Sequence, residues 1–162
     1  MIKNMRKTVF FIGSFLFLMS TGAVVKATGH VDLGLVKTIT SKADFLKVRA
    51  SGNNQVFIFT AKWCPACMSM KPTVERMARL FVGKIQFFTL DYDNPALGEL
   101  FDIHVINGIP TFLLSDECSQ TFLSHEGTFE DKKFEQALRR LIEQSCQKNT
   151  SKNRQINRNK TM

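Results

Sequence analysis

The sequence predicts an α/β fold in which a central mixed β-sheet is flanked by helices on both faces. Three observations lead to this expectation. Short apolar runs alternate with helix-like segments, which indicates parallel strands joined by helices. The last two strands are separated only by a short turn, which indicates an antiparallel hairpin. The chain has 162 residues, enough for one domain, and 44% of them are hydrophobic, as in a folded protein.

The first elements of this pattern are a strand, a helix and a second strand. The first strand is expected over residues 35–39. A helix should follow from Ser41, which has the residue type of an N-cap and precedes Asp44 by three positions. Residues 51–54, Ser-Gly-Asn-Asn, read as a loop. Residues 56–59 are an uninterrupted apolar run, typical of a central strand buried on both faces.

The remaining elements continue the alternation and close with a hairpin and a helix. In chain order we expect a helix over residues 65–81, a strand over 85–90, a short helix over 95–101, strands over 111–114 and 121–125, and a helix over 131–146. Residues 116–119 form the hairpin turn, and Gly127 ends the second strand of the hairpin. The last helix is inferred from apolar residues that recur along one stripe.

Positive charge is concentrated at the two ends of the chain. There are 22 Lys and Arg against 14 Asp and Glu, a net charge of +8. Residues 1–27 hold four of the basic residues and residues 147–162 hold five, and neither segment holds an acidic residue. Residues 28–146, the expected folded domain, therefore carry a net charge of −1. A nearly neutral domain offers little electrostatic attraction for nucleic acid, so we expect no nucleic-acid partner.

Residues 1–27 have the layout of a secretory signal peptide. Three basic residues precede an apolar run over residues 9–19, and small residues follow it. Cleavage is expected after Ala27, with Ala23 as the alternative site. The apolar run is shorter than the roughly 20 residues that a spanning helix needs, and an uncleaved anchor is the alternative. Export would place the domain where disulfides persist.

Residues 147–162 form a polar, basic segment without periodicity. We expect this tail to be disordered. Contact between the tail and acidic lipid headgroups is the alternative.

The chemistry of the sequence is concentrated in the segment Trp63-Cys64-Pro65-Ala66-Cys67. Two cysteines at this spacing, at the start of a helix that follows a buried strand, indicate a redox pair. The N–H groups and the dipole of the helix N-terminus stabilise a thiolate at Cys64. Cys67 lies one turn further on, within reach of Cys64 for a disulfide. We expect Cys64 to attack a substrate disulfide and Cys67 to resolve the mixed disulfide.

Other roles for this cysteine pair have less support. A zinc site needs a second cysteine pair or a spaced histidine pair, and the sequence has neither. Covalent haem needs a histidine directly after the second cysteine, where this chain has Met68. A purely structural disulfide is disfavoured because the helix start after Trp63 is expected to be exposed. We therefore expect no metal and no cofactor.

Together these motifs resemble the thioredoxin family, over residues 31–146. The strand followed by Trp-Cys-x-x-Cys is one shared feature, and Pro72, five residues after Cys67, is another. The segment Gly108-Ile109-Pro110-Thr111 matches the loop in which that family carries a cis-proline facing its active site. Gly127, followed by a terminal helix, also fits. The resemblance implies the thioredoxin fold and the activity of a thiol–disulfide oxidoreductase.

The resemblance also implies how a substrate is held. Pro110 is expected to be cis and to pack beside Cys64. Ile109 is expected to offer backbone hydrogen bonds to an extended substrate. Trp63, Ile109 and Pro110 would then line an apolar substrate groove.

The sequence departs from this family around the redox pair. Ile58 stands six residues before the first cysteine, where many thioredoxins have a buried acid, and the usual lysine of the neighbouring strand is also missing. Removal of the proton from Cys67 is then left to water, Lys62 or Glu75, although both side chains are more simply surface charges. The Pro-Ala pair lacks the histidine that raises oxidising power in strong oxidants of this fold, which favours a reductase.

Two further cysteines lie outside this motif. Cys118 is expected at the tip of the last hairpin, and Cys146 at the end of the last helix. The strand between them spans up to about 30 Å at ~3.3 Å per residue. The helix spans roughly 22 Å at ~1.5 Å per residue, so the two cysteines can meet once turn residues are subtracted. Because an exported domain seldom leaves thiols free, we predict a structural Cys118–Cys146 disulfide. Free or intermolecularly paired thiols are the alternative.

These observations predict an exported thiol–disulfide oxidoreductase, favoured as a reductase. Its substrates would be cysteine-containing exported proteins, and its electrons would come from a membrane thiol–disulfide relay. The chain ends without an ER-retention signal, which favours a bacterial periplasm. Nothing in it resembles a dimerisation domain, so we expect a monomer. The alternatives are a net oxidant or isomerase, and a binding or chaperone-like module with a structural disulfide.

Overall fold

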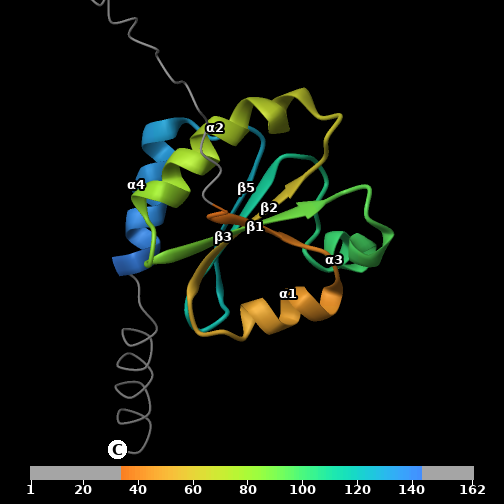
Figure 1. The fold of residues 1–162 in the computed structure, drawn as a ribbon, viewed down its shortest axis with the longest axis horizontal. Helices are drawn as coiled ribbons and strands as arrows, with labels where there is room; N and C mark the ends of the chain where they lie inside the picture. The colour runs from red at the N-terminus through yellow and green to blue at the C-terminus, as the bar shows by residue number, and fades with distance from the viewer. Residues whose placement is uncertain (1–33, 144–162) are drawn as a thin grey trace, which may run out of the picture. The chain divides into compact units, whose positions relative to one another are not determined.

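The computed structural model of the chain describes residues 34–143. They form a five-stranded mixed β-sheet with helices on both faces, which confirms the predicted fold class (Figure 1). The segments 1–27 and 147–162, for which we predict a signal peptide and a disordered tail, lie outside these residues. Within the described part of the chain, no helix is long and apolar enough to cross a membrane.

The elements follow the predicted order. They are β1 (Val36–Ile39), α1 (Lys42–Arg49), β2 (Asn54–Thr60), α2 (Pro65–Leu80), β3 (Ile85–Asp91), η1 (Pro95–Leu97), α3 (Gly98–Ile103), β4 (Thr111–Ser115), β5 (Thr121–Glu126) and α4 (Asp131–Glu143). Ser41 caps α1 as predicted, because its Oγ accepts a hydrogen bond from the N–H of Asp44 at 3.1 Å. The last helix is described as far as Glu143, and its predicted continuation to Cys146 lies outside the described residues.

The short helix expected over residues 95–101 is divided into two pieces. Asn94 caps the first piece, η1, by accepting a hydrogen bond from the N–H of Ala96 at 3.0 Å. This cap favours a 3-10 turn at the start of the segment. The α-helix α3 then begins at Gly98.

Strand β2 lies at the centre of the sheet. The strand order is β1-β3-β2-β4-β5, with β1, β3 and β2 parallel and β4 and β5 antiparallel to their neighbours. Phe59, near the end of β2, pairs with Thr111 at the start of β4. This register brings the cysteine segment that follows β2 next to the proline loop that precedes β4.

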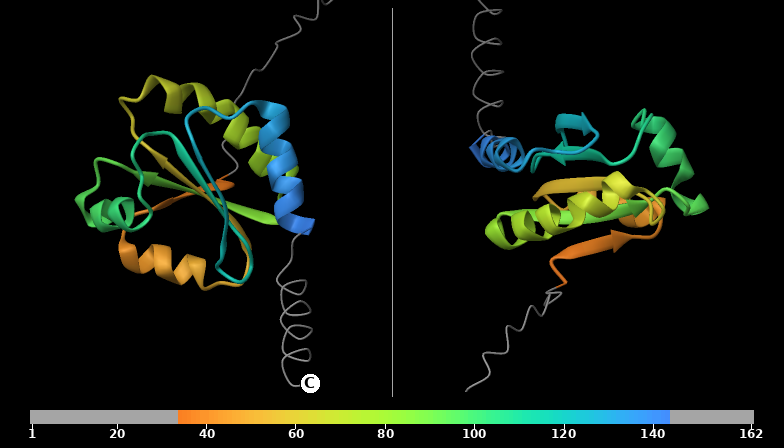
Figure 2. Two further views of the ribbon diagram at one scale, coloured as in Figure 1. Left: turned by 180° about the vertical axis from the view of Figure 1, so that it is seen from behind. Right: turned by 90° about the horizontal axis from the view of Figure 1, so that it is seen from above.

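Alternate residues of the strands contribute to two apolar cores. Helices α2 and α4 cover one face of the sheet, and α1, η1 and α3 cover the other (Figures 1 and 2). Phe57 and Phe59 of β2 point toward α1 and α3, whereas Val56 and Ile58 point toward α2 and α4. These four residues are all buried, as the apolar run predicts. Two packed faces hold β2 rigidly beneath the segment that carries the cysteines.

The end of α1 is tied to the turn between β4 and β5. Nη2 of Arg49 donates to the carbonyl of Ser119 at 2.8 Å, and the Ser119 hydroxyl donates to the carbonyl of Arg49 at 2.6 Å. The buried carboxylate of Asp116 accepts from the N–H of Cys118 at 3.0 Å and of Gln120 at 2.8 Å. Polar groups of the turn are thus paired within the fold.

Candidate active site

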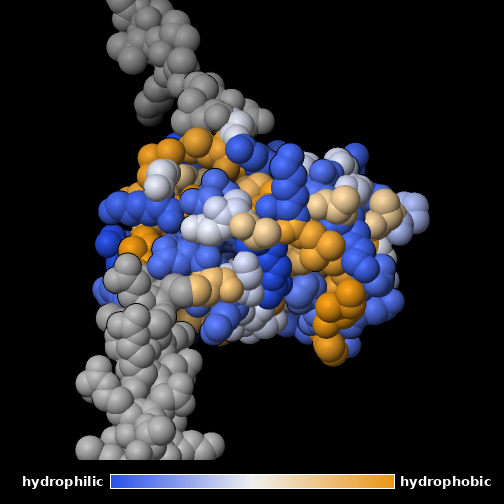
Figure 3. Space-filling model, turned by 90° about the horizontal axis from the view of Figure 1, so that it is seen from below, coloured by the Kyte–Doolittle hydropathy of each residue, from blue (hydrophilic) through white to orange (hydrophobic). Residues whose placement is uncertain are grey.

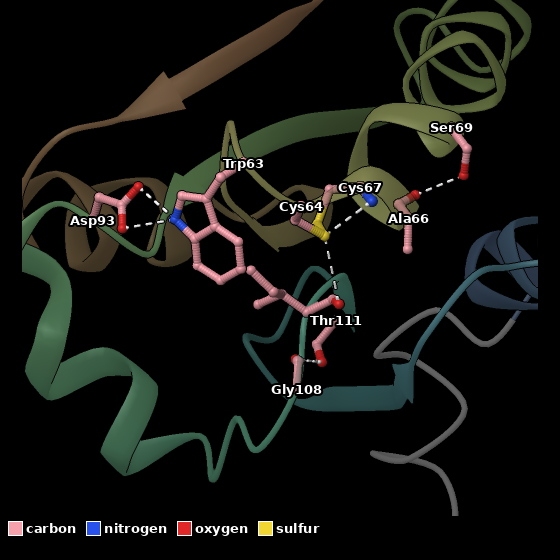
Figure 4. Close-up of a disulfide and its surroundings, with 9 residues drawn as sticks. Trp63, Cys64, Ala66, Cys67, Ser69, Asp93, Gly108 and Thr111 are labelled. Carbon is pink, nitrogen blue, oxygen red and sulfur yellow. Dashed lines mark hydrogen bonds between the residues drawn. A yellow bond between two sulfur atoms is a disulfide. The ribbon is translucent and has the colours of Figure 1, made fainter.

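Cys64 and Cys67 form a disulfide at the N-terminus of α2 (Figure 4). Cys64 is the N-cap residue of the helix and Pro65 is its first residue. The N–H of Cys67 donates to Sγ of Cys64 at an N–S distance of 3.1 Å. A donor at a helix N-terminus stabilises negative charge on this sulfur once the disulfide is reduced. The local geometry therefore favours Cys64 as the thiolate of the pair.

The cysteine pair is less exposed than the sequence led us to expect. Cys64 is 4% exposed and Cys67 is 7% exposed. Ile109, from the loop before β4, packs against the cluster that the two cysteines form with Ala61. The prediction of an exposed helix start is therefore wrong for Cys64, although the neighbouring Trp63 is 62% exposed. Exposure alone does not separate a redox pair from a structural disulfide here, so the groups around the pair must do so.

The Ile109–Pro110 peptide bond is cis, as the family resemblance implies. The carbonyl oxygen of Ile109 lies 3.7 Å from Sγ of Cys64. A Cys64 thiol can donate to this oxygen in the reduced protein. The N–H and C=O of Ile109 form no hydrogen bond with another backbone group of residues 34–143. They are available to an extended chain bound beside the disulfide.

The loop around Pro110 is fixed by two hydrogen bonds. The hydroxyl of Thr111 donates to the carbonyl of Gly108 at 2.7 Å, and the N–H of Gly127 donates to the carbonyl of Pro110 at 2.7 Å. The second bond attaches the loop to the end of β5. Ile109 is thereby held in place between two anchored neighbours.

Trp63 is held at the edge of the site by the turn after β3. Its indole Nε1 donates to both carboxylate oxygens of Asp93, at 3.0 and 2.9 Å (Figure 4). The ring of Tyr92 makes an edge contact with the indole at a centroid distance of 6.2 Å. Sequence reasoning did not identify Asp93. The parallel pairing of β2 and β3 could have indicated it, because the carboxyl ends of both strands meet at one edge of the sheet, with Thr60 opposite Asp91. Trp63 and Asp93 follow these two strand ends.

No acid lies beneath the cysteine pair at the position that many thioredoxins use. Ile58 is buried and pairs with Thr89 of β3 and Phe112 of β4. Lys62 is exposed and forms no side-chain hydrogen bond or ion pair within residues 34–143, whereas Glu75 is half-buried on α2. Which of water, Lys62 and Glu75 accepts the proton of Cys67 stays a prediction.

The segment between α3 and Pro110 contains a residue in a strained conformation. Val105 has a φ of 52°, although β-branched residues rarely adopt the left-handed region. The N–H of Val105 donates to the carbonyl of Asp102, and the N–H of Ile106 donates to the carbonyl of Phe101. This pair of hydrogen bonds is typical of a helix C-terminus, where glycine is favoured at the position of Val105. Val105 is 71% exposed, and apolar side chains gather at the end of the molecule where α3 lies (Figure 3).

The other predicted cysteine pair is partly described. Cys118 lies in the turn between β4 and β5 and is disulfide-bonded. Cys146 lies outside the described residues, so its pairing with Cys118 stays a prediction. Within residues 34–143, no group of three or more His, Cys, Asp or Glu side chains is placed to hold a metal ion.

Taken together, the site has a cysteine pair at a helix N-terminus, a cis-proline against it and open backbone groups beside it. This arrangement defines the class of thiol–disulfide oxidoreductases built on a CxxC pair. Residues 36–140 match the thioredoxin family, and the chain belongs to that family.

Several thioredoxins are similar to this chain in sequence. A thioredoxin H-type from Chlamydomonas reinhardtii is 32% identical over 83 residues, which cover 49% of this chain and 72% of that protein. A thioredoxin H-type from Fagopyrum esculentum is 32% identical over 73 residues, 45% of this chain and 60% of that protein. The chloroplastic thioredoxin-like protein HCF164 from Arabidopsis thaliana is 28% identical over 89 residues, 54% of this chain and 34% of that protein. The chain thus spans less than two thirds of the last two relatives.

Solved thioredoxin structures share the fold. The thioredoxin of Malassezia sympodialis (Mala s 13) superposes with a TM-score of 0.59 at 24% identity, over 66% of this chain and 90% of that chain. The thioredoxin of Trypanosoma brucei brucei gives a TM-score of 0.59 at 24% identity, over 65% of this chain and 89% of that chain. At this level of identity, the likeness establishes the architecture.

Proposed function

We propose that this chain is an exported thiol–disulfide oxidoreductase that reduces disulfides in cysteine-containing exported proteins. The observation that supports it most is the position of the Cys64–Cys67 disulfide, capped by the N–H of Cys67 and facing the open backbone groups of Ile109. Nucleophile, resolving thiol and a place for substrate backbone are all within one small region. Trp63, Ile109 and Pro110 form the apolar groove in this proposal.

The exchange proceeds in two steps. The Cys64 thiolate attacks one sulfur of a substrate disulfide, the substrate S–S bond breaks, and the released substrate thiolate takes up a proton. Cys67, after losing its proton, then attacks Sγ of Cys64. The mixed disulfide breaks, the Cys64–Cys67 disulfide closes, and the second substrate thiolate takes up a proton. The substrate gains two electrons and two protons, and the cysteine pair loses them.

The surroundings of Cys64 favour reduction of substrate disulfides by the cysteine pair over their formation. A reduced pair is stabilised by groups that stabilise its thiolate, and strong stabilisation makes the disulfide oxidising. The residues between the cysteines, Pro65 and Ala66, supply no charged donor. The N–H of Cys67 is the single hydrogen bond that Sγ of Cys64 accepts within residues 34–143. Because no charged donor adds to the stabilisation from the helix N-terminus, the Cys64 thiolate is a weaker leaving group than in strong oxidants, which favours a reductant.

The reduction potential tests this direction. The protein is equilibrated with glutathione and dithiothreitol buffers, and the fraction of Cys64–Cys67 disulfide is measured by alkylation and mass spectrometry. A potential near about −270 mV supports a reductase, and one near about −120 mV makes the protein a net oxidant instead. Failure of the pair to reduce reversibly would indicate a binding module with a structural disulfide.

Export and the electron donor are supported by the sequence. The basic start and apolar run of residues 1–27 support secretion, and a reductase outside the cytoplasm needs a membrane thiol–disulfide donor to be reduced again. Cell fractionation with N-terminal sequencing of the mature protein tests export, with cleavage expected after Ala27. A Cys67→Ser variant should trap substrates and donor as mixed disulfides, and the same variant with Cys64→Ser is the matched control.

A further inference from the structure

Glu126, the last residue of β5, lies against the loop that carries Pro110. A Cβ placed on Gly108 would stand 2.4 Å from Oε1 of Glu126 and 2.9 Å from its Cδ. The carboxylate therefore occupies the space beside the backbone of Gly108, the residue before Ile109. Glu126 also pairs with Thr111 across the two strands, which fixes its position relative to the loop.

The carboxylate of Glu126 is not paired with a cation among residues 34–143. The side chain is exposed and forms no hydrogen bond or ion pair with any group of residues 34–143. Asp93, the acidic residue on the other side of the site, differs because both of its oxygens accept from Trp63. Glu126 thus presents a solvated negative charge to whatever lies along the loop.

This charge stands next to the groups that would receive a substrate backbone. The N–H and C=O of Ile109 form no hydrogen bond with another backbone group of residues 34–143, Ile109 lies against Cys64, and Gly108 is one residue away from it. An extended chain advances ~3.3 Å per residue, so a carboxylate at Gly108 is within reach of side chains one or two residues from the reacting cysteine. Lys and Arg are long enough to reach it. Covering the carboxylate with an acidic or apolar side chain costs free energy.

We propose that Glu126 is a specificity-determining residue that selects partner polypeptides with a Lys or Arg within two residues of the reacting cysteine. This inference rests on the proposed exchange function and names its substrate class. The carboxylate attracts the basic side chain and repels an acidic one, so both effects favour the same partners. Glu126 contributes recognition, and the cysteines carry out the exchange.

The test uses two disulfide-containing peptides that are identical except for one residue beside a cysteine, Lys in one and Glu in the other. The reduced full-length protein should react with the Lys peptide about fivefold faster at low ionic strength, the scale of one exposed ion pair. Glu126→Gln should remove most of this preference, and Glu126→Lys should reverse it. Added salt should reduce the preference of the unaltered protein, because salt screens exposed charges.

The control is Glu117→Gln, which makes the same change of charge in the turn between β4 and β5. It should leave the preference unchanged. The reduction potential of each variant is measured as well, because a general effect of Glu126 on the thiolate would shift it and change both peptide rates equally. A shifted potential with equal changes in both peptide rates would overturn the role of Glu126 in specificity and leave the proposed exchange function standing. Exchange without a preference for the Lys peptide would do the same. Absence of exchange with either peptide would overturn the proposed function together with it.

Discussion

The two ends of strand β2 differ in the hydrogen bonds that surround them. At the end that begins with Asn54, polar groups from α1, β2 and the turn between β4 and β5 bond to one another. At the end that finishes with Thr60, the N–H and C=O of Ile109 beside the cysteine pair bond to no other backbone group of residues 34–143. We call these the closed end and the open end. Hydrogen bonds at the closed end connect elements of the fold, whereas the backbone of Ile109 at the open end is left for other contacts.

The closed end contains buried polar side chains with hydrogen bonds inside the fold, although Nη1 of Arg49, Oδ1 of Asn54 and Oε1 of Gln55 are buried there without a hydrogen-bond partner among the described residues. Gln55 is fully buried, and its amide donates to the carbonyl of Val48 and to the hydroxyl of Ser51. Asp116 accepts from two backbone N–H groups of the turn. Bonds of this kind stabilise the native state, since a buried polar group without a partner is costly.

The open end has a different chemistry around a similar covalent bond. Cys118 at the closed end and Cys64 at the open end are both disulfide-bonded, and Cys64 is the more buried of the two. What distinguishes them is their surroundings. Cys64 caps a helix N-terminus and contacts the carbonyl of Ile109, which bonds to no other backbone group of residues 34–143, whereas the N–H of Cys118 is bound to Asp116. Surroundings, rather than exposure, mark the reactive disulfide.

The largest effect should come from removing the nucleophile at the open end. Cys64→Ser is expected to lower the rate of disulfide exchange on the order of a thousandfold or more, as for loss of a covalent nucleophile. Stability should fall by only about 2 kcal/mol, because the disulfide closes a very short loop. Exchange with a small disulfide substrate and urea unfolding measure the two quantities. Exchange that persists in this variant would show that Cys64 is not the attacking thiol.

A change at the closed end should lower stability and leave the rate of disulfide exchange unchanged. Asp116→Ala removes a buried acceptor from the N–H groups of Cys118 and Gln120 and should lower the free energy of unfolding by about 2–3 kcal/mol. Urea unfolding measures this loss, with Glu117→Gln as a neighbouring control that should be nearly neutral. Exchange per folded molecule should be unchanged. A parallel loss of exchange would mean that the two ends are coupled.

A smaller effect should come from relaxing the strain beside the open end. Val105→Gly removes the steric cost of a left-handed conformation and should raise the free energy of unfolding by up to about 1 kcal/mol. Val105→Ala keeps a Cβ at the same φ and should give little of this gain. Thermal unfolding of both variants separates backbone strain from loss of the exposed side chain. Equal stability of the two would remove the argument for strain.

The smallest effect concerns His104, at the end of α3. Burial against the ring of Phe45, together with the charge of Arg49 from the closed end, lowers the pKa of His104 below 6.5. The unfolded chain then binds a proton at a higher pH than the folded protein does. Stability should therefore fall as the pH is lowered through 6.5 and level off below the folded pKa. His104→Phe should flatten this part of the stability curve measured by urea unfolding.

Most of the fold was predictable from local patterns. Apolar runs such as residues 56–59, the cap at Ser41 and the break at Gly127 each indicate their element without reference to distant residues. The division of the helix after Asn94 was missed, because one side-chain hydrogen bond decides between a 3-10 turn and an α-helix.

The site was predictable only in part. The CxxC spacing at a helix start indicates the redox pair, and the cis bond before Pro110 followed from the resemblance to a family. The burial of Cys64 was not predictable, because it depends on Ile109, 45 positions further along the chain. Asp93 and Glu126 were missed because no local pattern marks them, although the expected parallel pairing of β2 and β3 carried a signal for Asp93. Both reach the site only through the pairing of strands.

The hydrogen-bonded indole beside the disulfide has a practical consequence. Trp63 is the only tryptophan of the chain, and it directly precedes Cys64. Any change in tryptophan emission when the protein is reduced therefore originates at this position. Because Asp93 fixes the indole, its optical signal should come from one orientation on the open end. The molecule thus carries its own fluorophore, and its redox state can be followed without labelling either cysteine.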